Sequence, residues 1–248
     1  MGFFESIGNA LSTAFDAVCS FTASLAKVIG SPEFVSLAVE FVSKIGIAIP
    51  GMEIISAVLL GASIIATIAE SLGIKKDENA AELAMKAEKD GAKPEDFQST
   101  EAYINHLQEN VSLSFEDKEK LKEMRPEQKT AYTAVGSYLY AKACFERLGF
   151  FTGDLKESFL EGRIGEAIGD LCRLKEALSP DEFIACCRSL QEKGLSSGAL
   201  FDYIHNRTED IATDRMVQSA ICDAFRTLNP SMTDKQIMER IYQMNIED

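Results

Sequence analysis

Apolar residues recur at three- and four-residue steps along residues 3–29, and small polar or charged residues keep the same spacing on the other side. This period predicts a long amphipathic helix with a narrow, weakly charged polar face. Gly30 follows it, and Ser31-Pro32 is typical of the start of a new helix. The apolar positions are Phe4, Ile7, Leu11, Ala14, Phe15, Val18, Phe21, Leu25 and Val28.

Two further apolar helices are predicted next, over residues 33–48 and 52–72, separated by Pro50-Gly51. The second contains no charged residue between positions 54 and 69. Its polar residues are chiefly hydroxyls, which can bond back to carbonyls of their own helix. Together the two segments predict an apolar helical hairpin.

The rest of the chain also has the patterns of helices, and no alternating run of β-branched residues is long enough for a sheet. The helical pattern is weakest over residues 149–179, which contain five glycines. Helices are predicted over residues 79–90, 100–110, 115–124, 126–148, 180–193, 197–206, 208–228 and 233–245. The predicted fold class is all-α: a multi-helix bundle with an apolar N-terminal hairpin and a charged helical C-terminal domain.

Charged residues are distributed unevenly along the chain. Residues 1–74 contain six acidic and two basic residues, whereas the 248-residue chain contains 39 and 25. We therefore expect three parts: apolar amphipathic helices at 1–74 as a candidate membrane-active region, a connector helix and linker at 75–98, and an acidic helical domain at 99–248. The net charge of -14 disfavours nucleic acid as a partner, because phosphate backbones attract clustered Lys and Arg.

No motif for catalysis, a cofactor or a metal is found in the sequence. His106 and His205 are a hundred residues apart, and neither has the spacing of a zinc site, so each is expected at the surface or at a helix end. The six cysteines are irregularly spaced and include no C-x-x-C pair. We interpret them as reduced thiols in a core. The expectation is a protein without catalytic, cofactor-binding or metal-binding residues.

Two interpretations of residues 54–69 stay open. A central helix of a soluble bundle is apolar all round, and sixteen residues are fewer than the roughly 20 that cross a bilayer. Extended to residues 52–74, however, the segment is long enough to cross about 30 Å, with Glu53 and Glu70 near the two interfaces. Small residues four apart, such as Ala57 and Gly61, would let helices approach closely in lipid.

The apolar character extends over three consecutive predicted helices, which favours a membrane-active protein. In design this is similar to the pore-forming colicin domains, where an apolar helical hairpin lies inside a soluble bundle. The predicted function is a pore-forming or membrane-depolarising effector or toxin. The alternative is a non-enzymatic helical adaptor, chaperone-like or virion-associated protein whose apolar helices dock on a partner.

The expected partners are a lipid bilayer or helices of another chain, including a second copy in a homo-oligomer. No basic residue precedes the first apolar residues and no cleavage site follows them. We therefore expect synthesis in the cytoplasm without a Sec-type signal, export by a dedicated machine, and membrane association at the target. The predicted membrane or partner contacts are Phe4, Phe15, Phe34, Phe41, Leu59, Leu60, Gly61, Ile64, Ile65 and Ile68.

Overall fold

The computed structural model describes residues 57–150, 157–174, 177–208 and 210–244. Every regular element within these residues is helical, and they include no strand, which confirms the all-α prediction. The N-terminal hairpin predicted over residues 33–72 lies mostly outside the described residues, so it stays a prediction.

The helices have the following bounds. They are α4 (Ala62–Ser71), α5 (Ala80–Asp90), a 3-10 turn (Pro94–Asp96), α6 (Thr100–Asn110), α7 (Phe115–Glu123) and α8 (Pro126–Arg147). The chain continues with α9 (Glu157–Leu174), α10 (Pro180–Glu192), α11 (Gly198–Ile204), α12 (Ile211–Leu228) and α13 (Asp234–Met244). Most of these bounds agree with the sequence prediction to within a few residues.

Side-chain caps explain several of the helix starts. Ser114 is the N-cap of α7, and Ser179 is the N-cap of α10. In each case the Oγ accepts a hydrogen bond from the backbone N–H three residues later. In α7 the carboxylate of Asp117 accepts in return from the N–H of Ser114, at 2.8 Å. These reciprocal bonds satisfy N–H groups that have no partner inside a helix.

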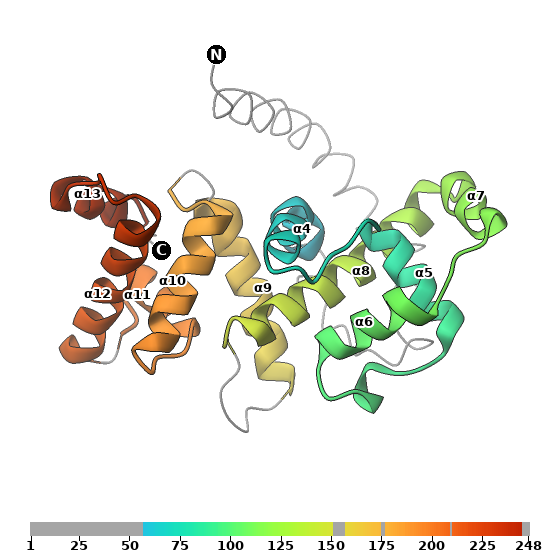
Figure 1. Cartoon of the computed structure of the whole chain (residues 1–248), viewed down its shortest axis with the longest axis horizontal. Coiled ribbons are helices and arrows are strands. Elements are labelled where there is room, and N and C mark those ends of the chain that lie inside the picture. The colour runs from blue at the N-terminus through green and yellow to red at the C-terminus, as the bar shows by residue number, and fades with distance from the viewer. Residues whose placement is uncertain (1–56, 151–156, 175–176, 209, 245–248) are drawn as a thin grey trace, which may run out of the picture.

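The helix α8 runs through the middle of the molecule (Figure 1). At one end α5 and α6 pack against it, and α7 lies beyond α5 at the edge of the molecule. Further along α8 lie α4 and α9, with α10 packed against α4, and the C-terminal helices α11, α12 and α13 form the opposite end. The apolar helix α4 therefore occupies a central position among the described helices.

The closest helix contact joins α5 to α8 at a glycine. A Cβ atom added to Gly136 of α8 would lie 1.7 Å from the carbonyl oxygen of Ala80, at the start of α5. Such a distance is impossible for a real Cβ, so any other residue at position 136 would force the two helices apart. The glycine thus fixes how closely α5 lies on α8.

One large cluster of buried apolar side chains extends through the described residues, from Val58 before α4 to Met244 in α13. It includes Leu83 of α5 and Leu107 of α6 as well as residues of all the later helices except α7. The proposed division of the chain near residues 75–98 stays a prediction. Within the described residues, helices from both sides of it contribute to the same core.

Residues 149–179, where the helical pattern of the sequence is weakest, contain the 18-residue helix α9. Glycine in a helix costs about 1 kcal/mol relative to alanine, which is why the sequence pattern looked weak. Five apolar side chains of α9 are 1–4 % exposed and belong to the core: Ile164, Ala167, Ile168, Leu171 and Leu174. Their burial offsets the low helix propensity of the glycines.

Candidate functional site

The candidate site is α4 with the residues just before it, 57–61, which together contain the described part of the uncharged stretch. Helical residues 57–60 precede it, and the hydrogen bonds from Gly61 N to Ala57 O and from Ile65 N to Gly61 O continue the helical pattern across the boundary. The helix ends where Gly73 adopts a left-handed backbone with φ of 72°. At that end the N–H of Ile74 donates to the carbonyl of Ala69 at 2.8 Å, as in a Schellman ending.

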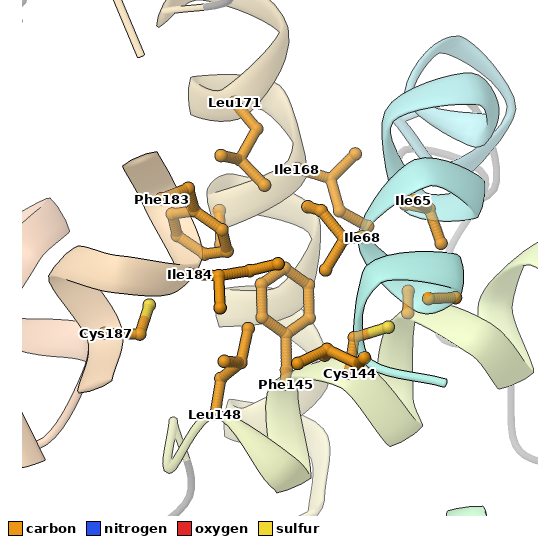
Figure 2. Close-up of a cluster of buried hydrophobic side chains, with 14 of the residues drawn as sticks. Ile65, Ile68, Cys144, Phe145, Leu148, Ile168, Leu171, Phe183, Ile184 and Cys187 are labelled. Carbon is orange, nitrogen blue, oxygen red and sulfur yellow. The ribbon is translucent and has the colours of Figure 1, made fainter. Parts of the chain in front are cut away.

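One face of α4 is buried against three other helices (Figure 2). Ile65 and Ile68 are each 3 % exposed, and Ala69 is fully buried. Figure 2 shows Ile68 beside Phe145 of α8 and Ile168 of α9, and α4 contacts α8, α9 and α10. This face is therefore part of the protein core.

The opposite face of α4 is open to solvent and has mixed character. Ser63, Thr67 and Glu70 are exposed on it, and Thr67 Oγ1 donates to the Ser63 carbonyl at 3.0 Å. The predicted bonding of a hydroxyl back to its own helix is thus confirmed at Thr67. Leu60, just before the helix, is 45 % exposed, and Ile64 is half-buried.

The structure does not gather the predicted contact residues on one outward surface. Leu59, Gly61, Ile65 and Ile68 are buried, Ile64 is half-buried and Leu60 is exposed. The other four predicted contacts, Phe4, Phe15, Phe34 and Phe41, lie outside the described residues. Among the described residues, no helix has both the length and the apolar character needed to cross a membrane.

Gly61 is the point where this segment lies closest to α9. A Cβ atom at position 61 would lie 2.4 Å from Ile168 Cγ2 and 3.5 Å from the sulfur of Cys172. The small residue at position 61, read from the sequence as a site for close helix approach in lipid, here allows close approach inside the protein.

Polar side chains of other helices hold the segment that follows α4. Arg147, the last residue of α8, donates from Nη1 to the Leu72 carbonyl at 2.7 Å. Gln108 of α6 donates from Nε2 to the Ile74 carbonyl at 3.3 Å. Carbonyls at a helix end have no partner within the helix, so these bonds satisfy groups that would otherwise depend on water.

A partly buried ion pair joins Glu78, just before α5, to Lys86 within α5. Lys86 Nζ is 2.8 Å from Glu78 Oε2, and the two side chains are only 14 % and 11 % exposed. Close by in the core, Tyr140 is 1 % exposed, and its burial, with the negative charge of Glu78, raises the pKa of its hydroxyl. The pair ties the connection after α4 to α5. Sequence reasoning missed it, because charged residues so close to a helix start are usually solvated.

A second buried polar pair joins α9 to the end of α11. His205 Nε2 is 2.9 Å from Asp170 Oδ2, and both side chains are 3 % exposed. Burial is the main cause that raises the pKa of Asp170, and the contact with His205 opposes it. His205 stands at a helix end, as the C-cap of α11, which is one of the two positions expected for it, and it is buried there rather than exposed at the surface.

The described residues contain no group of three or more His, Cys, Asp or Glu side chains placed to hold a metal ion. The five cysteines among them form no disulfide, and three of them, Cys144, Cys186 and Cys187, are buried. Burial raises the pKa of the Cys144 and Cys187 thiols to about 12. A thiol is nucleophilic only as thiolate, so these two are suited to packing rather than to reaction.

Comparisons of the chain with protein-family models, with curated proteins and with solved structures return no match.

Proposed function

We propose that this is a non-enzymatic, membrane-active helical protein, in which the apolar N-terminal residues contact a lipid bilayer and the helical body carries them. We further propose that it acts as an exported effector or toxin that permeabilises or depolarises its target membrane. The observation that supports the proposal most is the contrast in composition along the chain. Residues 1–56 contain only five acidic and two basic residues, and their predicted helices have broad apolar faces.

The packing of α4 is consistent with this division of roles. The body already has a continuous apolar core, which includes one face of α4. We assign lipid, rather than this core, as the partner of the apolar residues 1–56, because an apolar surface can be covered by lipid or by another protein.

Vesicles provide the test. Full-length protein added to dye-loaded phosphatidylcholine vesicles should bind them and release dye. Because the chain has a net charge of -14, we expect anionic lipid to weaken rather than to strengthen binding at low ionic strength. The proposal would be abandoned if the protein stayed unbound and caused no release over a range of pH and lipid composition.

A matched pair of variants distinguishes lipid contact by the N-terminal residues from non-specific adsorption of the protein to vesicles. Exchanging Phe34 and Phe41 for Asp should lower vesicle binding at least about tenfold, because each buried Phe contributes about 1.5–3 kcal/mol. Phe115→Asp is the control, since Phe115 lies on α7 of the body and is already 78 % exposed. Equal losses in both variants would argue against N-terminal contact.

The second candidate function is a helical adaptor whose N-terminal helices dock on another protein. The packing of Ile65 and Ile68 against α8, α9 and α10 favours it, because here residues of the same apolar stretch already have helices as partners. In that case full-length protein would form a defined oligomer or complex and would leave vesicles intact. Size-exclusion chromatography with light scattering, run beside the vesicle assay, distinguishes the two.

A further inference from the structure

We infer that α4 and the residues around it form a fixed anchor, which stays in the helical body while the preceding residues contact a membrane. This inference rests on the proposed membrane function and refines it. The segment that enters or lies on the bilayer would then end before Ala57. The anchor, residues 58–78, would not take part in insertion.

Apolar burial on both sides of Gly61 supports the anchor. Val58, before it, is 1 % exposed, whereas Leu72 and Ile74, beyond the end of α4, are 6 % and 0 % exposed. Pulling this segment away would expose those side chains together with their partners on three other helices. Phe145 and Ile168 would lose their cover at the same time (Figure 2).

Polar contacts fix the far end of the segment at three separate helices. Arg147 of α8 and Gln108 of α6 hold the carbonyls of Leu72 and Ile74. The Glu78–Lys86 pair then joins the connection to α5. Release of the whole anchor, residues 58–78, would have to break all three contacts, and it would leave a partly buried charge without its partner.

The anchor changes which part of the chain could contact lipid. If residues 58–74 stay in the body, the predicted span over residues 52–74 cannot form. The remaining segments, 3–29 and 33–48, have charged residues within their length, including Glu40 and Lys44 in the middle of the second. Such helices fit the plane of the lipid–water interface better than the hydrocarbon core.

A disulfide between the anchor and α9 tests this directly. Position 61 lies within reach of the native Cys172, because a Cβ there is 3.5 Å from its sulfur. Gly61→Cys requires Ile168→Ala alongside it, since Ile168 occupies the nearby space. The same protein with Gly61→Ser in place of the cysteine is the matched control that cannot cross-link. Peptide mapping confirms that the bond joins positions 61 and 172.

The oxidised, cross-linked protein should release dye from vesicles within about twofold of its reduced form, because α4 need not move. A loss of release on oxidation that reductant restores, absent from the Gly61→Ser control, would overturn the anchor and leave the membrane function standing. If no form of the protein acts on vesicles, the proposed function fails instead.

Amide hydrogen exchange of the unmodified chain tests independently whether α4 stays packed in the body. It does not depend on the disulfide forming or on any effect on vesicles. The amides of Ile65, Ile68 and Ala69 should exchange as slowly as those of Tyr138 and Leu139 in α8, through opening of the whole body. Exchange in α4 that is at least about 100-fold faster than in α8 would show that α4 opens separately, and would overturn the inference.

Discussion

The helices α4 and α7 are similar in length but differ in what holds them in place. In α7 only Leu121 is buried, the first residue Phe115 is 78 % exposed, and a reciprocal pair of cap bonds fixes the start. In α4 no side chain caps the start, yet Ile65, Ile68 and Ala69 are buried among three other helices. The start of α7 can be read from its local sequence, whereas α4 is held in place by the rest of the fold.

The largest effect is expected from a charge in the buried face of α4. Ile65→Asp should lower the free energy of unfolding by about 3–5 kcal/mol, because the carboxylate would be buried without a partner. Leu60→Asp makes the same change at a position that is 45 % exposed, and should cost under about 1 kcal/mol. Urea unfolding followed by circular dichroism measures both. Equal costs would show that the two faces of this segment do not differ.

The close approach of Gly61 to α9 predicts the next effect. Gly61→Ala should cost about 1–3 kcal/mol, because its Cβ would lie 2.4 Å from Ile168 Cγ2 in a full core. Gly169→Ala is the control within α9, where a Cβ meets no atom within 4 Å. That change should stabilise the helix by about 0.5–1 kcal/mol. If Gly61→Ala also stabilised the protein, α4 would not lie against α9 as described.

In α7 the expected effects are smaller and local. Ser114→Ala removes the N-cap hydroxyl that accepts from the N–H of Asp117, and should cost about 1 kcal/mol. Ser112→Ala, at an exposed position two residues earlier, should change stability little. Thermal unfolding compares the two variants. A cost as large as that of Ile65→Asp would mean that α7 is held by more than its cap.

The smallest effect is a pH dependence at Asp117. The Lys89 ammonium, followed by the two bonds from Ser114, lowers the pKa of this carboxyl from 3.8 to about 2. A carboxyl whose pKa is lower in the folded than in the unfolded protein stabilises the fold at pH values above its unfolded pKa. This contribution is lost as the pH falls from 3.8 to about 2. The stability difference between the native protein and Asp117→Asn should therefore shrink over that range. A difference that stayed constant would contradict the assigned contacts.

The sequence was enough to predict the helices whose ends are set locally. The cap at Ser114 and the restart at Ser179 can be read from a few adjacent residues, and the structure has both. The helix α9 was harder to predict, because its glycines lower helix propensity and only burial of side chains such as Ile168 offsets them.

The environment of α4 could not be predicted, because an apolar pattern does not tell protein neighbours from lipid. Gly61 illustrates this, since a small residue permits close helix packing in either setting. The buried pairs were missed for a related reason. Asp170 and His205 are 35 residues apart, and only the packing of α9 against the end of α11 brings them together.

We expect α4 to stay in the helical body even when the chain is bound to a membrane. Hydrogen exchange of full-length protein, measured with and without phosphatidylcholine vesicles, tests it most directly. We predict that the amides of Ile65, Ile68 and Ala69 keep the same protection in both conditions, as do those of α8. Loss of protection in α4 alone, on addition of vesicles, would show that α4 leaves the body and would contradict the account.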